Sequence, residues 1–317
     1  MLKDIIQKIL SAIPLLLIVS IILFVMINAL PGDAATSVLG DGASVEAMEA
    51  YAERMGYNDP VMVQYLRWLK NVLTGNWGRS TYSNEYVFDK IMQRLPISAE
   101  IVFWSLLVSL LVALPLGILS AVKRNSILDY MSSTISVIGV SMPAFWLGIL
   151  LIIAFAIELK ILPASGYYSM SEGLWLNLRS LIMPVIAVSF SFTSVLLRQT
   201  RSAMLEVINQ DYMMTARAKG LSKNAVLWKH GLRNAASPVA TVVSSQIGSI
   251  ICGMTVTEQV YRIPGMGNLL YNSILNRDYP VIMAQVMLMV VVVVIVNVLM
   301  DIVYILLDPR IAKSSNQ

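Results

Sequence analysis

Long apolar segments without charged residues constrain this chain more than any other feature. The first of them, Ile9–Leu30, has 22 residues and contains no Asp, Glu, Lys or Arg. A helix needs about 20 apolar residues to cross the hydrocarbon core of a bilayer, whereas the apolar part of a cleaved signal peptide has about 7–15. We therefore predict that this segment is a retained membrane helix preceded by a cytoplasmic N-terminus.

Five further segments are also long and apolar, with Glu100 and Asp301 as their only charged residues, and only 13% of the 317 residues are charged, against about 25% in soluble domains. The sequence predicts an all-α integral membrane protein with six transmembrane helices, which places both termini on one side. In the third, Met142-Pro143 predicts a kink, because proline cannot donate a backbone hydrogen bond. The predicted spans are Ile9–Leu30, Ala99–Ala121, Met131–Ile157, Leu181–Leu197, Pro238–Val256 and Val281–Leu307.

The segments between the spans give the domain organisation. Residues 1–30 form the N-terminus and first span, 31–98 an extracytoplasmic region, and 99–317 a core with a cytoplasmic loop at 198–237. In the outer region, Val61–Leu73 has apolar residues at helical spacing and predicts a helix. The acidic residues there lack the alternation of a calcium loop and indicate a solvated helix face. Glu258–Pro280 contains Ile263-Pro264-Gly265-Met266-Gly267, which cannot continue a helix, and is predicted to be a second outer loop.

The distribution of basic residues predicts the orientation. The segments that a six-span topology places on the side of the termini contain thirteen Lys and Arg, whereas the two short loops on the other side contain four. Short cytoplasmic loops are enriched in Lys and Arg, so the loop at 198–237 is predicted to be cytoplasmic. The same rule accounts for the basic stretch Arg198–Arg233, and nucleic-acid binding is not expected. Lys123, Arg124 and Asp129 are predicted to form a short turn on this side.

A polar, basic stretch, Leu205–Ala235, interrupts the apolar segments and contains the signals of a short helix. Asp211 is suited to the start of that helix. Arg217 and Lys219 would lie in its last turn, where they favour the helix dipole. Gly220 supplies the left-handed residue that ends a helix.

Ser222 is a second start signal, and a second helix is predicted at Lys223–Arg233. The result would be a rigid elbow attached to membrane helices at both ends. Such an elbow suits the transmission of motion between a soluble partner and the bilayer. The side chains that it would present are Tyr212, Met213, Ala216 and Leu221.

Catalytic and metal-binding patterns are missing from the sequence. It contains no Gly-Lys dipeptide, and so no phosphate-binding loop of the G-x-x-x-x-G-K-[ST] type. H-E-x-x-H and G-x-S-x-G are also absent. Cys252 and His230 are the only residues of their types, which excludes a metal cluster built from several cysteines or histidines. The chain is predicted to be no enzyme and to bind neither cofactor nor metal.

Ionisable residues within the predicted spans are few. Asp301 lies near the inner end of the sixth span, and Glu100 and Glu258 lie near outer boundaries. An ion-coupled secondary transporter places such groups near the middle of the membrane, so an external energy source is the better interpretation. An ATP-independent transporter or channel and a membrane scaffold remain alternatives.

Nine motifs together point to one family. They extend from Pro31 to Arg310, and the chain that contains them resembles the permease subunits of ABC importers, in the dipeptide and oligopeptide branch that also includes nickel and glutathione systems. The motifs are Pro31-Gly32-Asp33, Gln64-Tyr65-Leu66-Arg67-Trp68-Leu69, Met142-Pro143-Ala144-Phe145-Trp146, Leu162-Pro163-Ala164-Ser165-Gly166-Tyr167, residues 211–222, residues 230–235, Pro264-Gly265-Met266-Gly267, Arg277-Asp278-Tyr279-Pro280 and Leu307-Asp308-Pro309-Arg310.

The resemblance implies a type I ABC importer permease fold and a coupling helix that docks into a cleft on a cytoplasmic ATPase subunit. The wider family's Glu-Ala-Ala pattern falls on Met214-Thr215-Ala216, so its glutamate is absent here. Docking is then expected to depend on Tyr212, Ala216, Leu221 and the turn at Gly220. The residues implied in coupling are Asp211, Tyr212, Thr215, Ala216, Arg217, Ala218, Lys219, Gly220, Leu221 and Ser222.

The resemblance also implies partners and a location. They are a homologous second permease subunit in a heterodimer, two ATPase subunits that bind ATP and Mg, and an extracytoplasmic solute-binding protein, in a bacterial or archaeal cell membrane. Peptides are the implied substrates, with nickel chelates, glutathione and short oligosaccharides as alternatives. The residues implied in receiving the binding protein are Pro31, Gly32, Asp33, Pro264, Gly265, Gly267 and Asp278.

Overall fold

The computed structural model describes residues 2–29, 43–56, 58–222 and 225–307, and the regular elements in this part of the chain are helices. The predicted all-α class is therefore confirmed. Two π-helical turns, Ile152–Glu158 and Ala225–Gly231, and a 3-10 turn at Met170–Glu172 accompany the α-helices. The α-helices are α1 (Leu2–Asn28), α3 (Val45–Met55), α4 (Val61–Leu73), α5 (Val87–Val122), α6 (Ile127–Ser141), α7 (Ala144–Leu151), α8 (Leu174–Ile208), α9 (Asp211–Ala218), α10 (Leu232–Val260), α11 (Met266–Leu275) and α12 (Tyr279–Leu307).

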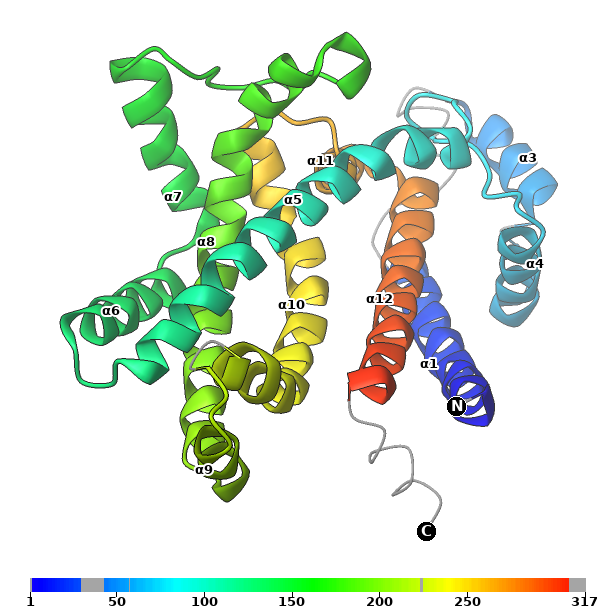
Figure 1. Ribbon diagram of the computed structural model, residues 1–317. Helices are drawn as coiled ribbons and strands as arrows, with labels where there is room; N and C mark the ends of the chain where they lie inside the picture. The colour runs from blue at the N-terminus through cyan, green and yellow to red at the C-terminus, as the bar shows by residue number, and fades with distance from the viewer. Residues whose placement is uncertain (1, 30–42, 57, 223–224, 308–317) are drawn as a thin grey trace.

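The long helices form a bundle with α8 at its centre (Figure 1). Helix α8 contacts α5, α6, α7 and α10, and α12 links α10 to α1. Helix α9 lies at one end of the bundle, where α1 begins and α12 ends, and α11 lies at the opposite end (Figure 1). The bundle thus has two ends that differ in their elements.

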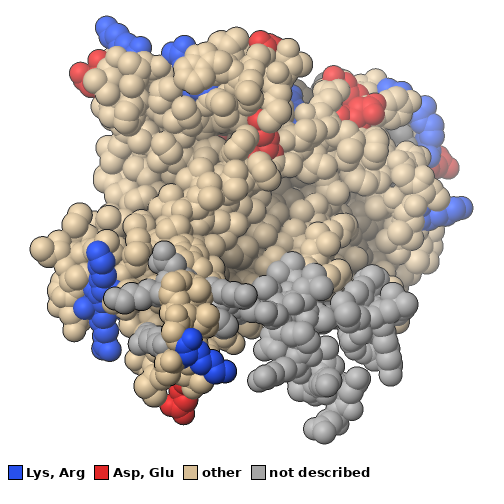
Figure 2. Space-filling model, viewed as in Figure 1, with Lys and Arg blue, Asp and Glu red and all other residues tan. Residues whose placement is uncertain are grey.

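Four helices, α1, α5, α8 and α12, are each long and apolar enough to cross a membrane. Two bent pairs bring the number to six if each pair is one span: α6 with the segment from Ala144 to Glu158, at 103°, and the two parts of α10, at 50°. Figure 2 shows charged side chains gathered toward the two ends of the visible face, with an uncharged band over α5 and α8 between them. This band is what a protein surrounded by hydrocarbon requires.

The break in the third predicted span lies where Pro143 predicted it. Helix α6 ends at Ser141 and α7 begins at Ala144, with Met142 in an extended conformation between them. An extended residue before proline is the expected conformation, because the proline ring excludes the α region there. The angle of 103° makes this a sharp corner rather than the kink that the sequence suggested.

Small side chains hold the central helices together. Ser109 in α5 is fully buried and donates a hydrogen bond to the carbonyl of Ser189 in α8 at 3.1 Å. Gly139 in α6 faces Ser194 of α8 so closely that a Cβ would lie 2.8 Å from the Cβ of Ser194. Close approach through small residues is the usual basis of helix packing in membranes, because apolar side chains gain little by leaving lipid for another helix.

The outer region is anchored on the bundle by aromatic side chains. The helix predicted at Val61–Leu73 is present with the same bounds as α4. Its Tyr65 is buried, and the Tyr65 hydroxyl forms a 2.8 Å hydrogen bond with Ser20 of α1. Phe24 of α1 and Met283 of α12 complete this buried cluster. The outer region therefore packs against both the first and the last helix.

Helix α5 begins earlier than the predicted second span. The span was expected to start at Ala99, but the helix starts at Val87 and passes through Pro96. Val87 and Ile91 are fully buried against residues of α11 and α12. This packing continues the helix beyond its membrane-spanning part.

Two other predictions about local structure were correct only in part. The helical segment predicted after Ser222 is present, and the Ser222 hydroxyl accepts from the Ala225 backbone N–H at 3.3 Å, but residues 225–231 form a π-helical turn that continues directly into α10. Gly231 there has right-handed φ and ψ angles of −67° and −61° and does not end the helix. In Glu258–Pro280, the break at Pro264-Gly265 is present, but α11 follows it, because apolar residues recur at helical spacing after Gly265 and bury Met266 and Leu269.

Candidate functional site

The short helix predicted around Asp211 is present as α9. Asp211 is its first residue, and the backbone N–H of Leu221 donates to the carbonyl of Ala216 across the end of the helix. Gly220 has a φ of 78°, the left-handed conformation that the sequence predicted. The segment predicted to couple to an ATPase thus contains a compact helix that ends in a glycine turn.

One face of α9 is turned toward its own chain. Met213 is fully buried and Ala216 is 8% exposed, and both pack against Val226 of the π-helical turn and Val207 of α8. The prediction that Met213 and Ala216 are presented to a partner was therefore wrong. Residues three apart lie on the same helix face, and this face is occupied by the chain on either side of α9.

The opposite face of α9 and the turn after it are exposed. Tyr212, Met214 and Leu221 are 42%, 57% and 43% exposed and provide apolar surface at this end of the molecule. Partial burial raises the pKa of the Tyr212 hydroxyl above its ordinary value. Arg217 lies in α9 itself. The other exposed residues of the predicted coupling set are Asp211, Thr215, Ala218, Lys219, Gly220 and Ser222.

A buried carboxylate organises the opposite end of the molecule. Asp278, which precedes α12, is 2% exposed and accepts hydrogen bonds from the Ser80 hydroxyl at 2.5 Å and the Thr81 backbone N–H at 3.0 Å. These bonds join the turn before α5 to the junction of α11 and α12. The Asp278 side chain is thus buried inside the protein, where it holds these two segments together.

A second buried carboxylate fixes the start of α11. Glu258 is fully buried and accepts from the Ser98 hydroxyl of α5 at 2.6 Å and the Asn268 backbone N–H at 2.9 Å. Ser98 in turn accepts from the Met266 N–H at 2.7 Å. The first N–H groups of a helix have no partner within the helix, and here two of them are paired. Sequence reasoning missed Ser98, since nothing local to a lone serine indicates a partner 160 residues away.

The glycines of the Pro264-Gly265-Met266-Gly267 motif allow this packing. A Cβ on Gly265 would overlap the carboxylate of Glu258, and a Cβ on Gly267 would overlap the backbone of Thr255. The carbonyl of Pro264 accepts from Arg94 at 3.1 Å. Gly265 and Gly267 are therefore buried contacts that position α11, while Pro31, Gly32 and Asp33 lie outside the described residues.

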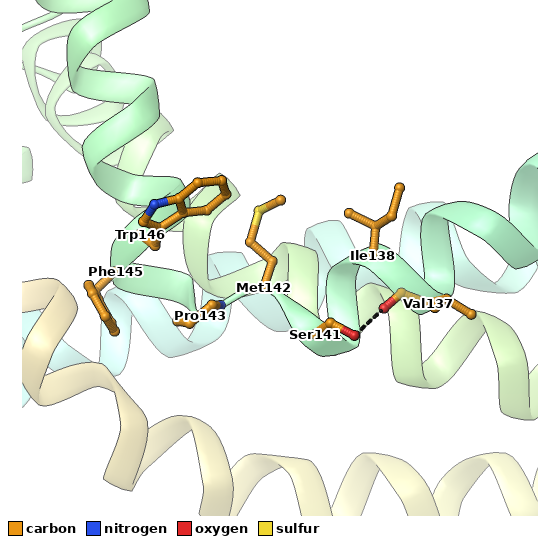
Figure 3. A pocket seen from close by; sticks show the side chains of 7 residues that line it. All are labelled: Val137, Ile138, Ser141, Met142, Pro143, Phe145 and Trp146. Carbon is orange, nitrogen blue, oxygen red and sulfur yellow. Dashed lines mark hydrogen bonds between the residues drawn. The ribbon is translucent and has the colours of Figure 1, made fainter.

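A cavity of about 540 Å³ lies in the corner between α6 and α7 (Figure 3). Its one hydroxyl, on Ser141, donates to the carbonyl of Val137 in its own helix at 3.0 Å. The lining offers no acid, base or nucleophile. The residues that form it are Val137, Ile138, Ser141, Met142, Pro143, Phe145 and Trp146. In the described part of the chain, no three His, Cys, Asp or Glu residues are grouped as metal ligands.

Comparison with known proteins identifies the family. Residues 113–313 match the family described as "Binding-protein-dependent transport system inner membrane component", and residues 1–102 match its N-terminal counterpart. The oligopeptide transport system permease protein AppB of Bacillus subtilis is 40% identical, over 97% of this chain and 98% of its own length.

Two further relatives have similar coverage. The dipeptide transport system permease protein DppB of Alkalihalophilus pseudofirmus is 35% identical, over 96% of this chain and 98% of its own length. The glutathione transport system permease protein GsiC of Escherichia coli is 37% identical, over 98% of this chain and 99% of its own length. An all-helical membrane protein whose two family matches extend over nearly its whole length thus belongs to the inner membrane components of binding-protein-dependent transport systems.

Proposed function

We propose that this chain is the non-catalytic permease subunit of an ATP-driven peptide importer in a cell membrane. The observation that supports this best is α9, a helix at one end of the bundle that exposes apolar side chains on one face and packs its other face on α8 and the π-helical turn before α10. A helix fixed in this way cannot move without moving the spans beside it. If an ATPase subunit docks on α9, the movement that ATP drives in that subunit is therefore passed directly to the membrane helices.

The docking surface in this proposal differs from the one that the sequence predicted. Tyr212, Met214 and Leu221 would contact the ATPase, because they are the exposed large apolar residues of α9 and of the turn after it. Ala216 would act from within, by holding α9 against Val226. The end of the bundle that carries α9 would lie on the cytoplasmic side. The two ATPase subunits would bind ATP and Mg.

Peptides are the proposed substrates. The relatives at 35–40% identity are named for oligopeptide, dipeptide and glutathione transport, and glutathione is itself a small peptide. A second, homologous permease would complete the path, and an extracytoplasmic binding protein would deliver the peptide to the surface around α11. Movement between inward-facing and outward-facing states would then follow the nucleotide cycle of the ATPase subunits.

A valine at Gly220 tests this function. Gly220 has a φ of 78°, which a β-branched residue resists, so Gly220→Val should distort the end of α9 and leave the spans in place. In the complete importer reconstituted in proteoliposomes, we expect normal assembly but uptake of isotope-labelled di- to hexapeptides lowered about tenfold or more relative to ATP hydrolysis.

Gly75→Val is the matched control. Gly75 has a φ of 80° and lies in the outer region, and at both Gly75 and Gly220 an added Cβ would have no atom within 4 Å. It should cost similar backbone strain without changing the ratio of uptake to hydrolysis. Wild-type uptake by Gly220→Val would contradict the proposed function.

A further inference from the structure

A buried carboxylate joins three segments near the end of the bundle where α9 lies. Asp129, in the first turn of α6, is 3% exposed. It accepts hydrogen bonds from the Ser120 hydroxyl of α5 at 2.5 Å and from the Asn125 backbone N–H of the intervening turn at 2.9 Å. Arg201 of α8 donates two more, from Nε at 2.5 Å and Nη2 at 2.8 Å. Four donors compensate the buried charge, which would otherwise be costly.

The helices on either side of this ion pair pack without space between them. A Cβ on Gly117 of α5 would lie 2.7 Å from the Cβ of Thr200, the neighbour of Arg201 in α8. Ile118 and Ala121 of α5 belong to one buried cluster with Met204 of α8. The ion pair thus lies at a close contact between the ends of α5 and α8, with Asp129 buried and Arg201 partly exposed.

The same packing continues from the ion pair to α9. Met204 lies one turn after Arg201, and Val207 lies one turn further along α8 and contacts the same cluster. Val207 also packs against the buried cluster of Met213 in α9. Side chains in van der Waals contact therefore connect α9 with the α5–α6 turn through the last turns of α8.

We propose that the Asp129–Arg201 ion pair is a positioning contact that makes the α5–α6 turn move as one body with α8 and α9. This inference rests on the proposed function, in which the ATPase subunits move α9. Apolar contacts between helices allow small sliding motions, whereas an arginine that donates two hydrogen bonds to one carboxylate has a single favourable geometry. The pair would thus extend the movement of α8 to α6, which turns sharply into α7.

Neutral variants of each partner test the proposal in the complete importer. We expect Asp129→Asn and Arg201→Gln each to raise the ATP hydrolysed per labelled di- to hexapeptide imported at least about threefold. The double variant should be no worse than either single variant, because both changes remove the same contact. Arg198→Gln is the matched control: Arg198 is exposed and lies one turn before Arg201 on α8, so its ratio should stay at the wild-type value.

A distance measurement separates coupling from simple destabilisation. Two spin labels report whether the α5–α6 turn and α8 move together. They are attached at Lys123→Cys in the turn and at Glu206→Cys in α8, in a Cys252→Ala background, and both labelled positions are exposed. In an importer without further changes, we expect one distance in the nucleotide-free and vanadate-trapped states. With Asp129→Asn, the distance should differ between these states.

Two results would overturn the proposal. One is an unchanged distance in Asp129→Asn, and the other is a wild-type ATP-to-peptide ratio in both neutral variants. If Gly220→Val uncouples transport while the neutral variants do not, the proposed function stands and the role of the ion pair is refuted. If Asp129→Asn does not assemble, Arg201→Lys provides the same test, since it retains the positive charge but not the two parallel hydrogen bonds.

Discussion

Single atoms decide the structure around α11. Gly267 faces the backbone of Thr255, and Gly265 faces the carboxylate of Glu258, so that hydrogen is the largest group that either position admits. The buried hydrogen bonds of Glu258 and Ser98 depend on this close approach. The two glycines of the Pro264-Gly265-Met266-Gly267 motif are therefore required by the packing of α11, independently of any contact that the surface of α11 makes.

Alanine at Gly267 tests this requirement. The added methyl group would overlap the backbone of Thr255, which cannot rotate away, and we expect Gly267→Ala to destabilise the protein by about 1–3 kcal/mol. Thermal unfolding of the detergent-solubilised protein is the measurement. Gly253→Ala is the control, because no atom lies within 4 Å of its added carbon; equal melting temperatures for the two variants would contradict the explanation.

At the scale of one element, α9 owes its position to a single buried face. Met213 is fully buried between α8 and the π-helical turn, whereas its neighbour Met214 is 57% exposed. We expect Met213→Ala to leave a cavity that costs about 2–5 kcal/mol. The loss should appear as faster amide hydrogen exchange throughout α9.

Met214→Ala serves as the comparison for that experiment, because it removes the same side chain from the solvent-exposed face. Hydrogen exchange in α9 should stay at the wild-type rate in this variant. Similar exchange rates in both variants would show that α9 is held by something other than the Met213 cluster.

Helix α9 and three other helices show what the sequence can and cannot predict. The left-handed Gly220 and the bounds of α4 follow from local rules, and both are confirmed. Which face of α9 is buried depends on Val226 and Val207, which reach it only in the folded chain. The partnership of Asp129 with Arg201 spans 72 residues and leaves no local signal. The predictions at Gly220 and α4 needed only neighbours in sequence, whereas the buried face of α9 and the Asp129–Arg201 pair depend on neighbours in space.

For the whole molecule, orientation remains a prediction from the count of basic residues, and cysteine labelling checks it. In a Cys252→Ala background, a maleimide that cannot cross membranes should label Tyr82→Cys in intact cells. Lys123→Cys should react only after permeabilisation. Both positions are exposed, so labelling of Lys123→Cys from outside would reverse the proposed topology.

The cluster of Phe24, Tyr65 and Met283 has a consequence for biosynthesis. These side chains come from the first helix, the outer region and the last helix. Ribosomes add about 5–20 residues per second. The interval between the synthesis of α4 and that of Met283 is therefore on the order of ten seconds or longer. Until then, the aromatic face of α4 lacks one of its packing partners. During that interval the nascent chain most needs a chaperone or lipid to cover this face.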